Sequence, residues 1–185
     1  QGVDRVATAL PHPTEQPDPP HFTLPAERLY AELVPFGPAY HNTVGEVLLG
    51  RDGAAAWLQA PEEQDVAPEI GPGAPWAVGA AGFPRLLGSP FPLDAAFHLA
   101  CAWGQRAMGR VLFPTGYGRR TVHRPIPQGS RMRCRLRPRE ITEAGGSFDL
   151  WITTAEGELL EQATAVRMQD LFRGRKLAPA WLRAV

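Results

Sequence analysis

The fold of this chain is decided by the stretch Gly88-Ser89-Pro90-Phe91-Pro92-Leu93-Asp94-Ala95-Ala96-Phe97-His98. A proline-rich turn leads into an apolar segment, and Pro92 suits the first turn of a helix because its missing N–H has no intrahelical partner there. Asp94 favours the same turn because a carboxylate stabilises the positive end of the helix dipole. The predicted helix runs to about Gly109, and its apolar stripe comprises Leu93, Phe97, Ala100, Cys101, Gly104 and Met108.

Asp94 and His98 are four residues apart and therefore project from one face of that helix. An acid and an imidazole on an apolar helix must be paired or used, because an unpaired buried charge is costly. Asp94 is either a general acid that an apolar tunnel keeps protonated near neutral pH, or a carboxylate satisfied by backbone amides at the helix start. His98 is either part of a site or a core histidine bonded to a backbone carbonyl.

Strand patterns flank the helix on both sides. Residues 40–49 and 54–60 form a predicted hairpin across the turn Gly50-Arg51-Asp52-Gly53. Residues 61–91 are rich in Pro and Gly and form a long loop, whose Trp76 and Phe83 are candidates for lining a tunnel. After the helix we expect strands over residues 117–125, 131–137, 147–155 and 159–168, the third being reached through a turn at Gly145-Gly146. Strict alternation makes residues 131–137 the clearest strand.

The chain contains one folded domain by this pattern. Residues 1–25 are a proline-rich linker, expected to be flexible, residues 26–170 are the domain, and residues 171–185 are a tail or a short helix. Cys101 and Cys134 fit no zinc spacing and are predicted to be buried thiols in a reducing compartment. No apolar run of membrane-spanning length and no signal-peptide pattern is present in the sequence, so we expect a cytoplasmic protein without a membrane partner.

Formal charge is zero overall but is divided along the chain. Residues 1–91 hold 4 basic and 11 acidic side chains, and residues 92–185 hold 15 basic and 8 acidic ones. The arginines of the second half are either a face that attracts an acidic partner or a solvated sheet face paired with Asp149, Glu158 and Glu161. No aromatic residues interleave with them, which disfavours nucleic-acid binding. The arginines of this predicted face are Arg119, Arg120, Arg124, Arg131, Arg133, Arg135, Arg137 and Arg139.

Three landmarks, in order along residues 29–170, resemble the C-terminal half of polyketide synthase dehydratase domains and the related product-template domains. The landmarks are Tyr30-x-x-Leu33 with Phe36-Gly37-Pro38-Ala39-Tyr40, the helix segment Leu93-Asp94-Ala95-Ala96-x-His98, and Phe113-Pro114. The resemblance implies an α+β hot-dog fold, in which an antiparallel β-sheet wraps around one long central helix.

The resemblance also implies a function. The family acts on β-hydroxyacyl thioesters carried by an acyl carrier protein on phosphopantetheine, without a further cofactor or metal. Asp94 corresponds to the catalytic acid, His98 is its helper or a contact to the thioester, and backbone amides at Leu93–Ala95 polarise the thioester carbonyl. Substrate-binding positions are Tyr40, Pro90, Leu93, Phe97 and Phe113. An exposed sheet edge predicts a homodimer or pairing with another hot-dog domain.

One element of the family pattern is absent. The family's base is a His in a His-x-x-x-Gly-x-x-x-x-Pro motif, and the nearest match, His41 to Gly45, has Gly50 in place of the proline. The base is therefore His41 or comes from a second hot dog. Two alternatives stay open: a non-catalytic hot-dog module that binds a carrier or builds an oligomer, and an acyl-thioester hydrolase in which Asp94 activates water.

Overall fold

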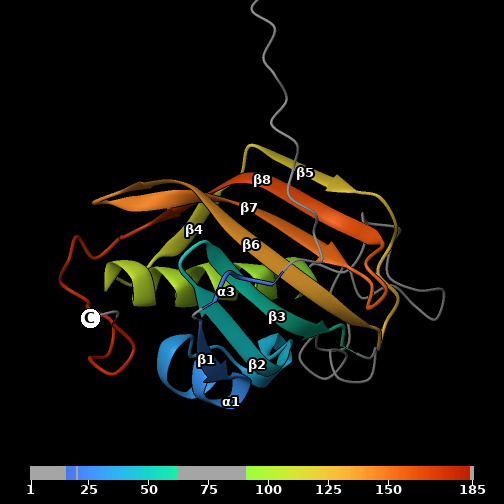
Figure 1. Cartoon of the computed structure of the whole chain (residues 1–185), viewed down its shortest axis with the longest axis horizontal. Coiled ribbons are helices and arrows are strands. Elements are labelled where there is room, and N and C mark those ends of the chain that lie inside the picture. Colours follow the sequence, from blue (N-terminus) through green and yellow to red (C-terminus); the bar gives the residue numbers. More distant parts are fainter. Residues whose placement is uncertain (1–15, 20, 62–90, 184–185) are drawn as a thin grey trace, which may run out of the picture.

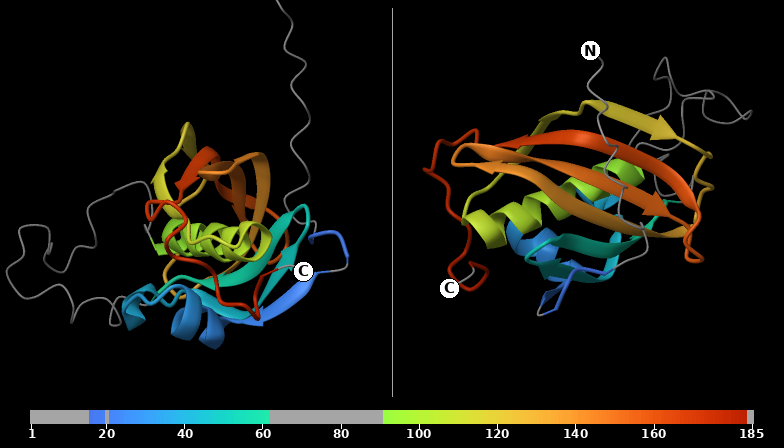
Figure 2. Two further views of the ribbon diagram at one scale, coloured as in Figure 1. Left: turned by 90° about the vertical axis from the view of Figure 1, so that its left-hand side faces the viewer. Right: turned by 45° about the horizontal axis from the view of Figure 1, so that its top comes forward.

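One long helix, α3 (Phe91–Met108), forms the centre of the molecule. The structure, a computed structural model, describes residues 16–19, 21–61 and 91–183, and in these residues an antiparallel sheet of eight strands curves around the helix (Figure 1). The views of Figure 2 show the strands crossing over one side of α3 while the chain between β1 and β2 closes another side. This arrangement is the α+β hot-dog fold that the sequence predicts.

The order of the strands in the sheet differs from their order in the sequence. They are β1 (Phe22–Pro25), β2 (Thr43–Gly50), β3 (Gly53–Gln59), β4 (Phe113–Gly116), β5 (Arg119–Val122), β6 (Arg131–Thr142), β7 (Gly145–Thr153) and β8 (Leu159–Gln169). The spatial order is β1-β2-β3-β6-β7-β8-β4, and β5 pairs with β8 beside β4. Helix α1 (Ala26–Arg28), a π-helical turn (Leu29–Leu33) and a 3₁₀ turn (Pro38–Tyr40) connect β1 to β2.

The buried part of the circumference of helix α3 is wider than the single apolar stripe that the sequence predicts. Ala95, Leu99 and Ala102, which lie outside the predicted stripe, are completely buried because the sheet wraps around the helix. Gly104 allows a close approach, since a Cβ there would lie 2.5 Å from the Leu112 side chain. Gly104 therefore admits a neighbour close to the helix backbone, and that neighbour belongs to the chain leading into β4.

Alternation along β6 agrees with the prediction on the inner face. Met132, Cys134 and Leu136 are buried against the core. Arg135 differs from the expected solvated arginine, because its guanidinium is buried and donates hydrogen bonds to the carbonyl oxygens of Ala54 (3.1 Å) and Leu136 (2.8 Å). It also pairs with Asp52, so the β2–β3 turn closes over it.

Three elements differ from the sequence-based expectation. The predicted strand over residues 117–125 is shorter, β5 alone, and β4 precedes it along the same edge of β8. Gly145 and Gly146 belong to β7 rather than to a turn, and a Cβ at Gly145 would collide with the carbonyl oxygen of Met168. Strand β1 begins at Phe22, inside the predicted linker. Described residues 171–183 contain turns and no helix, which agrees with the predicted tail rather than with the alternative of a short helix.

Two predictions for irregular segments lie partly or wholly outside the described residues. The loop over residues 61–91 is one of them, with Trp76 and Phe83 in its undescribed part. The other is the predicted linker, of which the structure describes residues 16–19 and 21–25. There Pro17 is buried, and the Asp18 amide donates a 2.9 Å hydrogen bond to the Asp52 carboxylate. Its last residues are therefore attached to the β2–β3 turn.

Candidate functional site

Asp94 and His98 meet on the first turns of α3. The imidazole Nε2 lies 3.1 Å from an Asp94 carboxylate oxygen, with the His98 side chain 4% exposed and the Asp94 side chain 37% exposed. The two atoms are within ion-pair distance but are poorly aligned, and neither ring nitrogen has a hydrogen-bond partner among the described residues. The imidazole is thus the side chain that the structure places beside the Asp94 carboxylate.

Aromatic rings hold the imidazole in place of hydrogen bonds. Phe36 stacks on His98 with ring centroids 5.0 Å apart and 19° between the planes. Tyr30 meets the same imidazole edge-on at 5.6 Å. The landmark around Tyr30 and Phe36 therefore folds directly onto the Asp94–His98 pair, which local spacing alone did not predict.

An apolar cavity of about 200 Å³ opens beside this pair. Its walls are residues 33–36, the α3 side chains of Asp94, Phe97, His98 and Cys101, residues 111–114, and Lys176. Concave, mostly apolar sites with a few converging polar groups are typical of small-molecule binding. The predicted binding residues Phe97 and Phe113 line the cavity together with Asp94 and His98.

Of the other predicted site residues, none that the structure describes lines this cavity. Leu93 is buried in the core, and Tyr40 is exposed with its ring 5.7 Å from Phe91; neither lines the cavity. Pro90 lies outside the described residues. His41 stacks on Tyr30 at 4.1 Å, and its Nε2 lies 2.8 Å from the Phe36 carbonyl oxygen. His41 is therefore separated from His98 by the Tyr30 ring and does not line the cavity.

Burial controls the ionisation of two groups near the site. Desolvation raises the pKa of Tyr30, and the negative charge of Asp94 raises it further, whereas hydrogen bonds from Thr43 oppose the shift. The Thr43 amide donates to the Tyr30 hydroxyl at 2.8 Å. Burial raises the pKa of the Cys101 thiol to about 11, which keeps the thiol protonated and unreactive near neutral pH. Cys134 is likewise a buried free thiol, as predicted.

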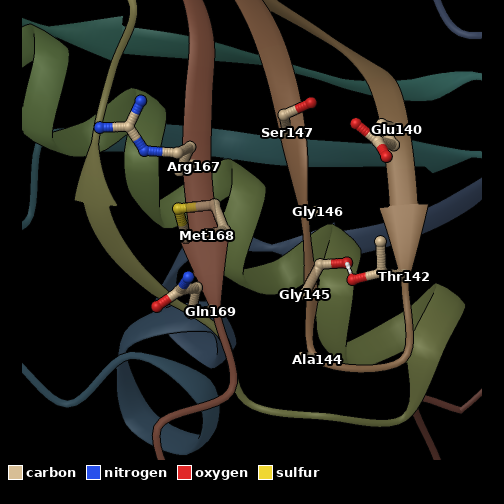
Figure 3. A pocket seen from close by; sticks show the side chains of 9 residues that line it. All are labelled: Glu140, Thr142, Ala144, Gly145, Gly146, Ser147, Arg167, Met168 and Gln169. Carbon is tan, nitrogen blue, oxygen red and sulfur yellow. Dashed lines mark hydrogen bonds between the residues drawn. The ribbon is translucent and has the colours of Figure 1, made fainter.

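A second hollow, of about 220 Å³, lies at the β6–β7 hairpin (Figure 3). Glu140, Ser147 and Arg167 stand in register across β6, β7 and β8 along its rim. Gly145 and Gly146 line it without side chains, and a Cβ at either glycine would collide with neighbouring atoms. The lining residues include one carboxylate and no histidine or cysteine, so this hollow lacks the acid–imidazole pair of the first cavity.

The arginines of the second half pair on the sheet rather than converge on the cavity. None of the eight predicted arginines is among the residues that line it. The predicted pairing with acidic residues is confirmed for Arg120 with Glu161 (2.6 Å), Arg124 with Glu158 (2.8 Å) and Arg139 with Asp149 (3.3 Å). The exposed side chains of Arg124 and Arg139 support the solvated-face interpretation, whereas Arg120 pairs with a buried carboxylate, Glu161.

Two other kinds of site receive no support from the described residues. Within them, no three His, Cys, Asp or Glu side chains gather as a metal site. None of their helices is both long and apolar enough to span a bilayer.

Comparison with known families gives one match over most of the chain. Residues 7–178 match a family model described as the polyketide synthase dehydratase N-terminal domain. That description names one half of the dehydratase domain, whereas the Asp94 landmarks of this sequence resemble the other half. No curated protein matches the chain.

Solved structures with the same fold include several dehydratase domains. The dehydratase domain of RzxB from Pseudomonas fluorescens aligns with a TM-score of 0.60 and 17% identity, over 80% of this chain and 50% of that one. A GphF dehydratase variant aligns with a TM-score of 0.60 and 18% identity, over 87% of this chain and 54% of that one. The dehydratase domain of a mycocerosic acid synthase-like polyketide synthase aligns with a TM-score of 0.59 and 18% identity, over 80% of this chain and 49% of that one. This chain therefore spans about half the length of the solved structures that it matches.

Proposed function

Because this chain belongs to the polyketide synthase dehydratase family, we propose that it acts in the removal of water from β-hydroxyacyl thioesters, with Asp94 as the acid. The observation that carries the proposal is the Asp94 carboxylate, 3.1 Å from the buried His98 imidazole at the wall of an apolar cavity. A carboxyl group that meets a substrate in such a cavity is suited to proton transfer.

The proposed reaction is an elimination. A base removes the α-proton of the thioester, the bond between the β-carbon and its hydroxyl breaks, and the protonated Asp94 carboxyl gives its proton to the leaving oxygen. The products are an α,β-unsaturated thioester, water and the Asp94 carboxylate, which is reprotonated before the next turnover. His98 orients the carboxylate through its Nε2, and the amides of the first α3 turn face the developing charge on the thioester oxygen.

The base is proposed to come from a second hot-dog domain, either another copy of this chain or a partner. Two observations support this. His98 is already paired with Asp94, and His41 lies behind Tyr30. Strand β4, at one end of the sheet, supplies Phe113 and Pro114 to the cavity wall, so a domain that pairs along β4 would stand beside the site. An acyl carrier protein, with substrate on phosphopantetheine, is the proposed delivery partner.

The test is turnover of a β-hydroxyacyl pantetheine thioester by the full chain, at protein concentrations that favour self-association. We expect dehydration by the wild type, read by mass spectrometry as loss of water, and a loss of at least about a hundredfold in Asp94→Asn, because general acid catalysis contributes roughly 10²–10⁴-fold. Glu46→Gln, which neutralises an exposed carboxylate on β2, is the matched control and is expected to keep full activity.

The products distinguish the alternatives. Free acid in place of the unsaturated thioester, abolished by Asp94→Asn, would assign the chain to the acyl-thioester hydrolases. Binding of pantetheine thioesters without turnover, in wild type and variant alike, would overturn the catalytic proposal in favour of a non-catalytic binding module.

A further inference from the structure

Lys176, the only lysine of the chain, is brought to the cavity by the C-terminal segment. Its neighbour Leu177 forms a β-bridge with Arg110, and the Ala178 amide donates a 2.9 Å hydrogen bond to the Gly109 carbonyl oxygen. Gly109 and Arg110 directly follow the last residue of α3, whereas Asp94 lies in its first turn. The segment therefore anchors the backbone at Lys176 near the end of the helix that is opposite Asp94. Figure 1 shows the red C-terminal segment beside one end of α3.

The cavity extends along α3 between these two charged groups. Asp94 and Cys101 line it seven residues apart, which corresponds to about 10 Å along the helix axis. The positive charge of Lys176 acts on the Cys101 thiol, where it lowers the pKa against the larger effect of burial. Lys176, an exposed residue, and Cys101 thus both line the cavity, whereas Asp94 lines it from the first turn of α3.

No acidic side chain among the described residues forms an ion pair with Lys176. Asp94, the carboxylate that lines the same cavity, is paired with His98 instead. The nearest ring is Phe172, with its centroid 5.3 Å from Nζ, and Phe172 packs against Phe113 of the cavity wall at 5.6 Å. A cation at an apolar wall is stabilised by an anionic or strongly accepting oxygen and is penalised by hydrocarbon that displaces its water.

We propose that Lys176 determines specificity by binding an oxygen acceptor, best a carboxylate, at the far end of the acyl group whose β-carbon lies at Asp94. This inference rests on the proposed function, because it assumes that the cavity holds the acyl chain. A volume of about 200 Å³ accommodates roughly seven water-sized groups of about 30 Å³ each, so a short acyl chain fills the space between the two charges.

The test measures binding rather than turnover, with pantetheine amides of unreactive acyl chains that lack a β-hydroxyl. A length series ending in a carboxylate is compared with a series of the same lengths ending in a methyl group. We expect the wild-type chain to bind the best carboxylate probe about tenfold more tightly than its methyl counterpart, to lose that preference in Lys176→Met and to retain it in Lys176→Arg. Arg175→Gln, which removes a charge one residue away and outside the cavity lining, is expected to keep the preference.

A second measurement uses the unique lysine directly. An amine-reactive reagent acylates Lys176, and mass spectrometry of the peptide that carries it reports the rate. We expect the carboxylate probe to slow this acylation and the methyl probe to leave it unchanged at equal occupancy of the cavity.

The outcomes separate this inference from the proposed function. Equal binding of the two series by the wild type would overturn the role of Lys176 and leave the acyl cavity in place. Failure of both series to bind would overturn both. The phosphate of the phosphopantetheine arm is a second oxyanion that Lys176 could bind, and probes with and without this phosphate test it. If Lys176→Met weakens the binding only of probes that carry the phosphate, the lysine contacts the carrier arm and the inference is wrong.

Discussion

His98 is a buried imidazole whose ring nitrogens lack aligned hydrogen bonds among the described residues. Leaving a buried polar group unsatisfied costs about 1–3 kcal/mol, so the ring is held there by packing. Phe36 stacks on one face of it although the Phe36 side chain itself is 51% exposed. The orientation of the acid's partner thus depends on a ring that the rest of the fold does not enclose.

Substitution at Phe36 tests this dependence. Phe36→Ala removes the stacked ring and is expected to lower dehydration turnover about tenfold, while the free energy of unfolding falls by only about 1 kcal/mol, because the ring is half exposed and an aromatic pair contributes roughly 0.5–1.5 kcal/mol. Phe36→Tyr keeps the ring and is expected to keep turnover. The measurements are turnover by mass spectrometry and urea unfolding. Equal turnover in the Ala and Tyr variants would contradict the positioning role.

At this scale the sequence predicts contacts that depend on local spacing. Asp94 and His98 are four residues apart on a helix, so their proximity follows from helical geometry alone. Phe36 and Lys176 reach the same cavity from segments more than fifty positions away from His98. No local pattern encodes such contacts, and only the Phe36-Gly37-Pro38 landmark pointed to the first of them.

The β2–β3 turn is held by a buried charge pair. Arg135 of β6 is 4% exposed and pairs with Asp52, which also accepts the Asp18 amide. Burial lowers the pKa of Arg135, and the Asp52 charge opposes that shift. One carboxylate therefore connects three segments: the end of the N-terminal extension, the turn and β6.

Removing Asp52 is expected to leave the buried Arg135 cation without a charged partner, with only the carbonyl oxygens of Ala54 and Leu136 to accept its hydrogen bonds. Asp52→Ala should lower the free energy of unfolding by about 3 kcal/mol, because breaking one side of a buried pair costs roughly 3–5 kcal/mol. Asp52→Ala combined with Arg135→Met should recover most of this loss. As a control, Glu158→Ala removes half of an exposed pair with Arg124 and should cost no more than about 1 kcal/mol. The measurement is denaturant unfolding of the four proteins, and a double variant no more stable than Asp52→Ala would refute the argument.

Elements with strong periodicity or clear turn residues are predicted well. Helix α3, the Gly50–Gly53 hairpin and the alternating β6 all follow from such signals. The sequence does not predict β4, because its four residues carry no clear alternation and its strand conformation depends on pairing with β8. Gly145 was assigned to a turn because glycine marks turns, whereas here it lets β7 approach the backbone of β8.

At the scale of the whole molecule, the two edges of the sheet have different surroundings. Strand β1 ends the sheet on one side, and β4 with β5 ends it on the other. Only the β4 end contributes residues to the cavity wall. Unpaired strand edges invite pairing with another chain, and the chain spans half the length of the solved structures it matches. The β4 edge is therefore the proposed position of the second hot dog.

The same substitution at each edge tests this position. Thr115→Lys places a charge on an exposed residue of β4 and is expected to abolish self-association of the full chain, because an edge lysine opposes strand pairing. Thr23→Lys makes the equivalent change on an exposed residue of β1 and is expected to leave association unchanged. Sedimentation velocity of both variants and the wild type gives the answer. Dissociation by Thr23→Lys alone would place the interface at the other edge.

The position of β3 beside β6 has a kinetic consequence. Their register joins residues more than seventy positions apart, such as Gln59 with Arg131, and the whole of α3 lies within the loop that this pairing closes. The hairpins β2–β3 and β6–β7 form from near neighbours, whereas the seam between them requires a large loss of chain entropy before any contact repays it. Refolding should therefore be slow for a chain of this size, with the two hairpins protected from hydrogen exchange before the seam. Synthesis on the ribosome would leave β2 and β3 waiting for their partner until β6 has emerged.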